Sequence, residues 1–217
     1  MRYVRKRGQP PQALIDWCAR EWDPRPEAER ATYQVAKDLW EGAFQRAAAK
    51  GKTLEALCED QGYLCAYCSK QIRDGACHIE HLQARSVAPL HTFDFANLLA
   101  SCNGENSDSC GHKRKSNALL VHPLLPDCEG RFRYLDTGGV LALAEDDDDT
   151  SRTIATLGLD NPRLRRMRQG AICALLKAER KLGLSREQML RGYLAEAPPT
   201  PLSSFLPALC YALRSRQ

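Results

Sequence analysis

Apolar residues recur at helical spacing in the first and last parts of the chain. Prolines at positions 11 and 24 bracket residues 12–20, which are expected to form one helix. Residues 27–50 predict a long amphipathic helix, because apolar side chains recur three or four positions apart: Ala28, Ala31, Val35, Leu39, Ala43 and Ala47. Gly51 is placed to end that helix, and Thr53 is placed to cap a shorter one that reaches about residue 61.

The second half of the chain predicts a hairpin followed by helices. Residues 131–144 alternate around a Thr-Gly-Gly turn, which is typical of a β-hairpin. The acidic run 145–149 is expected to be an exposed loop. The helical pattern that follows breaks at residues 160–162, where Asp160 or Asn161 can cap a helix that begins at Pro162. Ser185 can start another helix, and prolines at 198, 199 and 201 precede a last one.

Short segments with paired cysteines and histidines replace the helical periodicity between residues 63 and 115. The sequence therefore predicts an α+β fold in which a small, metal-bound ββα unit is wrapped by helices. We expect a basic segment and helices over residues 1–62, the metal-bound module over 63–118, and a hairpin with C-terminal helices over 119–217, all packed as one domain.

The composition is that of an ordinary globular protein, with 43% hydrophobic and 27% charged residues among 217. No apolar run approaches the roughly 18 residues of a membrane span, and the charged start lacks the apolar core of a secretory signal. These features predict a cytoplasmic protein that does not contact a membrane. The net charge is only +4, but basic residues gather at 2–7, 113–115 and 163–168 while acidic ones gather at 145–149. Such segregation suits an anionic partner, with solvated surface charge as the alternative for each cluster.

Four of the ten cysteines stand at metal-ligand spacing. Cys65 and Cys68 form a CxxC pair, and Cys102 and Cys110 follow after 33 residues, so four thiolates can bind one structural Zn²⁺. The second pair encloses seven residues rather than two, which leaves Cys77 as a substitute ligand for Cys102. The five others are expected to act as small hydrophobic residues: Cys18, Cys58, Cys128, Cys173 and Cys210. A redox CxxC would need a βαβ setting that the sequence does not offer.

Catalytic residue types lie between the two cysteine pairs and just beyond them. Glu80 and His81 stand together, Asn97 precedes two leucines, and His112 follows Cys110 and a glycine. In these residues the chain resembles the HNH nucleases, whose motif runs from an acidic residue or His followed by His, through Asn before an apolar pair, to His or Asn at a helix start. The resemblance implies a zinc-stapled ββα-metal nuclease module over residues 63–118.

The chemistry of phosphodiester hydrolysis explains these residue types. A neutral imidazole is well placed to take a proton from water near pH 7, which makes His81 the expected general base. Glu80 and His112 are the expected ligands of Mg²⁺ or another divalent cation that stabilises the leaving oxygen. Adjacent residues on a strand point to opposite faces, so Glu80 and His81 can act on the same phosphate only if the strand end is twisted. Asn97 is expected to fix the loop that carries the base, because its amide both donates and accepts.

Some roles stay open on the sequence alone. His78 shares a strand face with Glu80 and is either a third ligand or a supporting residue. Asn103 is the alternative to His112 as the last member of the motif. The stretch Lys113, Arg114 and Lys115 favours His112, because these residues are expected to bind phosphate at a helix start.

Segments beyond the HNH motif resemble the nuclease subunit of the bacterial Septu anti-phage systems, which also occurs beside certain retrons. The resemblance covers most of the chain to about residue 175: the basic start with Pro10, Pro11 and Trp17, residues 61–68, 79–81, 97–99, 110–113, 132–134 and 138–139, then Leu157, Leu159, Asn161, Leu164 and Arg168. It implies an ABC-type ATPase as partner. It also implies, in a retron setting, a reverse transcriptase and its reverse-transcribed DNA.

The predicted function is therefore that of a metal-dependent nuclease that cleaves DNA or RNA, with transfer RNA as one option. The alternative is a non-catalytic, zinc-stabilised subunit that binds nucleic acid or acts as a scaffold for the ATPase, and a thiol-redox protein ranks last. If the helical flanks dock onto an ATPase, exposed apolar side chains are expected at Trp17, Trp40 or within residues 202–213.

Overall fold

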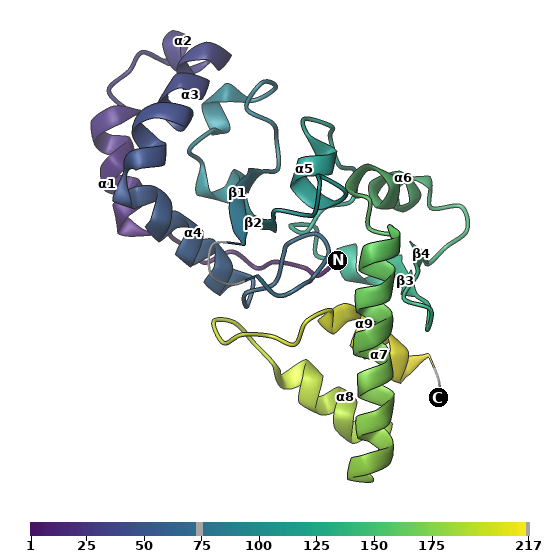
Figure 1. Cartoon of the computed structure of the whole chain (residues 1–217). Coiled ribbons are helices and arrows are strands. Elements are labelled where there is room, and N and C mark those ends of the chain that lie inside the picture. The colour runs from purple at the N-terminus through teal and green to yellow at the C-terminus, as the bar shows by residue number, and fades with distance from the viewer. Residues whose placement is uncertain (73–75, 216–217) are drawn as a thin grey trace.

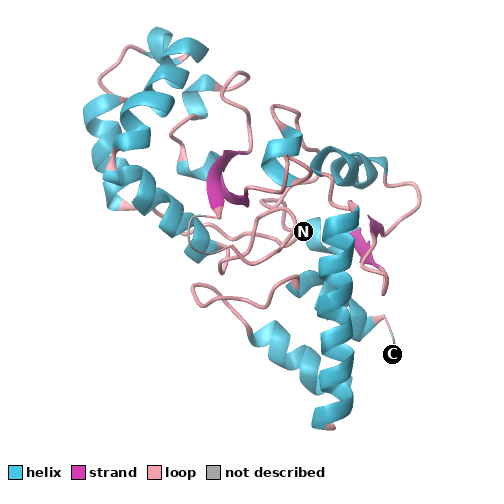
Figure 2. Cartoon of the chain, viewed as in Figure 1, coloured by secondary structure: helices cyan, strands magenta, loops and turns pink. Residues whose placement is uncertain are grey.

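The computed structural model describes residues 1–72 and 76–215 of the chain. It is mostly helical with two small antiparallel sheets (Figure 2). The sheet β1–β2 lies between the N-terminal helices α1–α4 and the helices α6–α9 of the second half (Figure 1). The predicted α+β class, a cysteine-bound ββα module within a mainly helical chain, is confirmed. The first helices are α1 (Gln12–Glu21), α2 (Glu27–Arg30), α3 (Tyr33–Leu39) and α4 (Ala48–Asp60), with a π-helical turn η1 (Trp40–Phe44) between the last two.

The predicted single helix over residues 27–50 is wrong. It divides into α2, α3 and η1, and the backbone is extended at Ala47 before α4 begins. Gly51 does not end a helix but lies inside α4, where Thr53 donates to the Ala49 carbonyl at 2.7 Å instead of capping. Aromatic packing explains the irregularity, because it places Trp40 and Phe44, 4.8 Å apart between ring centroids, in one cluster with Trp17, Trp22 and Phe93.

The central sheet pairs β1 (Cys77–His81) with β2 (Leu98–Cys102), so that Glu80 lies opposite Leu99. All of β2 is buried. Gln61 joins it to the end of α4, because its side chain accepts from the amide of Ala100 and donates to the Ala100 carbonyl, both at 2.8 Å. Short 3-10 turns at Pro89–His91 and Phe95–Asn97 lie in the loop between the two strands, and α5 (Cys110–Arg114) follows β2.

The second half follows the predicted pattern with one correction. The hairpin is present as β3 (Phe132–Tyr134) and β4 (Val140–Ala142), and a 3-10 turn at Cys128–Arg131 precedes it. The acidic run is not all loop, because Asp147 caps α6 (Asp148–Leu157) and pairs with Arg131 at 2.6 Å. Asn161 caps α7 (Pro162–Leu182) with Pro162 at its first position, as predicted. Ser185 caps α8 (Arg186–Ala195), and α9 (Leu206–Arg214) ends the described chain.

Much of the basic charge has partners inside the protein. Lys6 donates to the Leu98 carbonyl at 2.7 Å and lies 3.9 Å from the centre of the Phe95 ring. Arg7 binds Asp60 at 2.7 Å. Lys6 and Arg7 of the N-terminal cluster therefore bind groups within the fold.

The basic cluster on α7 is also engaged. Arg163 donates to both carboxylate oxygens of Asp108 at 2.8 Å, and Arg165 pairs with Asp160. Arg168 is buried and donates to the carbonyls of Gly138 and Leu159. These three arginines therefore bind groups of the chain itself.

The apolar flanks complete the protein's own core. Trp17 and Trp40 are 4% and 6% exposed, and the apolar side chains expected to be free between 202 and 213 are buried: Leu202, Phe205, Leu206, Leu209 and Leu213. The expected exposure of these residues is wrong, because α9 packs against α7, α8 and β3. No helix of the described residues is long and apolar enough to cross a membrane.

We predict that Lys6 makes the free energy of unfolding rise between pH 7 and pH 10. Burial lowers the pKa of Lys6 from 10.5 to about 7, so in this window the unfolded chain binds the extra proton and the folded chain does not. Lys6→Met removes the titrating group and should flatten the rise, by up to about 1.4 kcal/mol per pH unit. Urea unfolding at several pH values measures this change in the free energy of unfolding with pH. The exposed Arg5→Met is the matched control, since arginine keeps its proton throughout; equal slopes in wild type and Lys6→Met would contradict the prediction.

Candidate active site

The four predicted zinc ligands meet in one buried cluster. Cys65 and Cys68 follow α4, Cys102 ends β2, and Cys110 begins α5, and their ligand atoms all lie within 4.8 Å of one another. Sulfur atoms at the corners of a zinc tetrahedron, with Zn–S bonds of about 2.3 Å, are about 3.8 Å apart. The sulfur separations are 3.7 Å for Cys65–Cys110, 3.8 Å for Cys68–Cys102 and 3.6 Å for Cys102–Cys110. Donor set and spacing therefore fit a structural zinc ion.

The substitute ligand Cys77 lies outside this cluster. Cys77 begins β1, and its sulfur is 3.9 Å from the sulfur of Cys58 in α4. Cys58, Cys128 and Cys210 are buried and Cys18 is half-buried, as expected of small hydrophobic residues, but Cys173 is exposed. Within the described residues, only the four-cysteine cluster brings three or more ligand atoms this close together.

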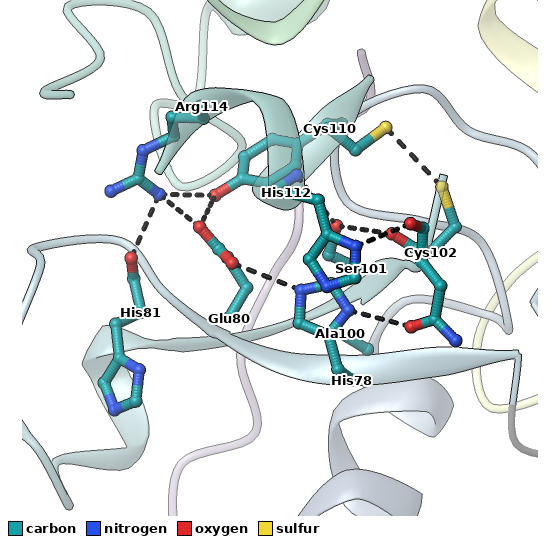
Figure 3. Close-up of polar contacts among 12 residues, drawn as sticks. His78, Glu80, His81, Ala100, Ser101, Cys102, Cys110, His112 and Arg114 are labelled. Atoms are coloured by element: carbon teal, nitrogen blue, oxygen red, sulfur yellow. Dashed lines mark hydrogen bonds and ion pairs between the residues drawn. The ribbon is translucent and has the colours of Figure 1, made fainter. Parts of the chain in front are cut away.

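Glu80 is held from two sides on β1. Its Oε1 accepts from Arg114 Nη1 at 2.7 Å and lies 3.5 Å from the Tyr67 hydroxyl. Its Oε2 lies 3.3 Å from Nε2 of His78, which shares the same strand face. Figure 3 shows the carboxylate between Arg114 and His78. One oxygen is therefore fixed by the guanidinium, while the other faces the imidazole.

Arg114 is structural, and its predicted binding to a phosphate is wrong. The residue is 1% exposed, because α5 turns its side chain inward. Besides Glu80, the guanidinium donates to the carbonyls of His81 at 3.0 Å and Leu82 at 2.7 Å. The run of three basic residues carries no sequence signal that would single out the buried one. Lys113 and Lys115 are exposed, and Lys115 lines a cleft that Glu80 and His81 also line.

His112 lies beside His78. The two rings stack with centroids 4.4 Å apart and planes inclined by 9° (Figure 3). Nδ1 of His112 lies 2.7 Å from the Asn103 carbonyl oxygen, and Nδ1 of His78 lies 3.0 Å from the Asn103 side-chain oxygen. Asn103, the alternative last member of the motif, thus contacts both imidazoles, whereas His112 itself lines the cleft.

Gly111 permits the close approach of α5 to β1. A Cβ atom at this position would lie 2.3 Å from Oε2 of Glu80 and 3.0 Å from Nε2 of His78. Its amide donates to the Ser101 hydroxyl of β2 at 3.3 Å. Only glycine therefore lets the helix carry His112 this close to the strand. The sequence offered this signal in Cys-Gly-His, but its meaning depends on the fold.

His81 ends β1 with its ring directed away from Glu80 (Figure 3). Its Nε2 lies 3.0 Å from the carbonyl oxygen of Thr92, and the ring contacts Trp40 edge-on at 4.4 Å. Because a carbonyl can only accept, the proton is on Nε2, and Nδ1 keeps its lone pair. Burial, with the positive charges of Arg85 and Arg114, lowers the pKa of His81 from 6.5 to about 3, so the ring is neutral at pH 7.

Asn97 fixes the loop that follows His81. Its Nδ2 donates to the carbonyls of Gln83 and His91, both at 3.0 Å, and its Oδ1 accepts from the Gln83 amide at 2.7 Å. These are the kinds of backbone contact that the sequence predicts for Asn97. Its part in catalysis stays a prediction.

A cleft of about 400 Å³ joins these groups. Glu80 and His81 both line it, although neighbouring residues on a flat strand would point to opposite faces. This shared position is what a twisted strand end would allow. Its other lining residues include Tyr33, Trp40, His78, Arg85, Gly111, His112 and Lys115. A carboxylate oxygen and imidazole nitrogens form a donor set that fits a divalent cation, and Glu80 and His112 would hold it.

The comparisons agree with this class of site. No protein-family model matches the chain. A curated protein of Vibrio cholerae serotype O1 biovar El Tor, "Retron Vc95 putative HNH endonuclease", is 32% identical over 126 residues. The match covers 54% of this chain and 61% of that relative, so the chain spans less than two thirds of the relative's length. The chain is a distant homologue of this retron protein.

We predict about one zinc ion per chain, bound by the four cysteines. Cys65→Ser should reduce the zinc content to near zero and lower the yield of soluble protein, because metal binding contributes directly to folding. The exposed Cys173→Ser removes a thiol outside the cluster and should keep the zinc. Elemental analysis of the purified proteins measures the metal. Soluble wild-type protein without zinc would refute the assignment.

Proposed function

We propose that this protein is a metal-dependent HNH nuclease that hydrolyses phosphodiester bonds in DNA or RNA, transfer RNA included. One observation carries the proposal. A single cleft is lined by a neutral imidazole with a free Nδ1, His81, and by the donor groups of a cation site, Glu80 and His112. Among the described residues, Nδ1 of His81 has no hydrogen-bond partner, so it is available to water.

The mechanism follows from these positions. His81 Nδ1 takes a proton from a water molecule as the water oxygen attacks phosphorus, and the bond from phosphorus to the leaving oxygen breaks. A divalent cation, when bound, stabilises the negative charge on that oxygen. Thr92 holds the imidazole tautomer through its carbonyl, and Asn97 holds the loop that contains Thr92. Arg114 fixes the strand end by binding the carbonyls of His81 and Leu82.

Arg85 is placed to bind the phosphate. It lines the cleft, and its charge lowers the pKa of His81, so the two side chains act on each other. Its guanidinium lies 5.5 Å from the centre of the Trp40 ring and 3.6 Å from Glu41. Its Nη1 is buried without a hydrogen-bond partner in the described part of the chain. A phosphate in the cleft would pair with the exposed part of this guanidinium and bring the scissile bond beside His81.

The biological setting belongs to the same proposal. The resemblance to Septu nucleases and the name of the Vibrio relative, which contains "Retron", support an effector of a bacterial anti-phage system. We infer that it acts with an ABC-type ATPase and, in a retron, with a reverse transcriptase and its reverse-transcribed DNA. A catalytically silent, zinc-stabilised scaffold of that complex is the competing function.

We predict that His81→Ala lowers the cleavage rate by at least about 100-fold, because general-base catalysis contributes 10²–10⁴-fold. Zinc content should stay at the wild-type value, and the melting temperature should fall only by the loss of the ring's contacts with Thr92 and Trp40. Cleavage of duplex DNA, single-stranded DNA and total RNA with Mn²⁺ or Mg²⁺ is measured, with and without the ATPase. His91→Ala removes a histidine outside the cleft and serves as the control. Full activity of His81→Ala would remove it as base, and an inactive wild-type complex on every substrate would support the scaffold.

We predict that Arg85→Ala weakens nucleic-acid binding about tenfold in a His81→Ala background, where cleavage is at least about 100-fold slower. The slope of log K against log salt should fall by about one, as for one lost phosphate contact. Arg85→Lys should restore part of the affinity, since the charge remains. Arg20→Ala, on the exposed face of α1, provides the control for net charge. Unchanged affinity and slope in Arg85→Ala would show that Arg85 does not contact the substrate.

A further inference from the structure

We propose that His78 is a third ligand of the cation that Glu80 and His112 would hold, and that Asn103 orients both imidazoles for this task. The site is then a pair of histidines with one carboxylate, and it takes a first-row transition metal such as Mn²⁺ in preference to Mg²⁺. This inference rests on the proposed function, which supplies the cation site. To that site it adds His78 as a ligand, Asn103 as the residue that orients the two imidazoles, and a preference for Mn²⁺ over Mg²⁺.

The first argument is the position of His78. Residues two apart on a strand share a face, and Nε2 of His78 is 3.3 Å from Oε2 of Glu80. Oε2 is the oxygen that Arg114 does not bind, because that guanidinium contacts Oε1. The carboxylate therefore offers its second oxygen on the side of His78, where a cation can lie between the two.

The second argument is the tautomer that Asn103 selects. The backbone carbonyl of Asn103 can only accept, so the Nδ1 atom of His112, 2.7 Å away, carries the proton. The side-chain oxygen of Asn103 faces Nδ1 of His78 in the same way at 3.0 Å. Each ring bound to a cation thus presents Nε2 as its ligand atom. A histidine ligand held through its other nitrogen is a common arrangement in metal sites.

The third argument is the direction of the two rings. They are parallel within 9° with centroids 4.4 Å apart, and one residue holds both at Nδ1. Nε2 of His78 faces the Glu80 carboxylate, and Figure 3 shows the ring of His112 lying over that of His78 beside it. Gly111 keeps this space open, since a Cβ there would lie 2.3 Å from Oε2.

The donor set decides the metal. Imidazole nitrogens suit Mn²⁺, Fe²⁺, Co²⁺ and Zn²⁺, whereas Mg²⁺ prefers oxygen ligands and gives up its water reluctantly. Two histidines and a carboxylate that leave other positions open are a known arrangement for such metals. These three residues do not form a ligand group as tight as that of the four cysteines, so the exposed His112 side chain has to move closer when the cation binds.

The test counts imidazole ligands on bound Mn²⁺. Mn²⁺ is chosen because thiolates compete poorly for it, so the zinc cluster does not interfere. The full-length, zinc-loaded protein is titrated with Mn²⁺, and the loss of the free-ion electron paramagnetic resonance signal gives the affinity. Pulsed spectroscopy of the bound ion reports nitrogen couplings. Wild type should show two imidazole nitrogens and bind Mn²⁺ at least about tenfold more tightly than Mg²⁺.

The variants separate a ligand from a supporting residue. His78→Ala and His78→Gln should each show one imidazole nitrogen and bind Mn²⁺ about 10-fold to 100-fold more weakly. Asn103→Ala should still show two imidazole nitrogens but bind Mn²⁺ about tenfold more weakly. His91→Ala should match wild type. One nitrogen in wild type, or two in His78→Ala, would overturn the proposal, as would equal affinities for Mg²⁺ and Mn²⁺. Zinc content and melting temperature verify that each variant is folded.

The number of imidazole ligands on bound Mn²⁺ is measured without any cleavage assay, so the two hypotheses can fail separately. If wild type binds Mn²⁺ through two imidazoles but cleaves no nucleic acid, the metal site stands and the nuclease function fails. If wild type cleaves but shows one imidazole in both wild type and His78→Ala, the nuclease function stands and this inference fails.

Discussion

The four-cysteine cluster is the constraint on which the site depends. It joins the loop after α4, the end of β2 and the start of α5, segments that contribute little regular structure of their own. An isolated helix as short as α5 is not stable in water, so its place against β1 has to come from tertiary contacts. The residue after Cys110 is the glycine that touches Glu80, and the next is His112. A metal ion bound by the four cysteines would thereby set the position of the cleft.

A buried guanidinium links that support to the chemistry. Arg114 ends α5, and it binds Glu80 together with the backbone on either side of the strand end, at His81 and Leu82. Burying an isolated charge is unfavourable, and this one is offset by a carboxylate partner and several carbonyl acceptors. The same contact fixes one oxygen of Glu80 and leaves the other facing His78. The position of the carboxylate and that of the imidazole are therefore coupled through one side chain.

Local signals predicted the features that local chemistry controls. The hairpin turn, the Asn161–Pro162 helix start and the cysteine spacing each depend on a few neighbouring residues, and the structure contains them. The helix expected over residues 27–50 fails because packing around Phe93 overrides its periodicity. Arg114 was misplaced for a related reason, since charge alone does not reveal which of three basic residues faces inward. The burial of Trp17 likewise depends on contacts between segments distant in sequence.

The low pKa of His81 has a consequence for the proposed chemistry. A base with a pKa of about 3 is always free of its proton at pH 7 but accepts a new one weakly. One cause of that low pKa, the positive charge of Arg85, is offset when an anion enters the cleft. A bound phosphodiester pairs with Arg85 and places negative charge beside the ring, and both effects raise the pKa of His81 toward neutrality. On the proposed mechanism, the bound substrate therefore makes His81 a stronger base than it is in the free protein.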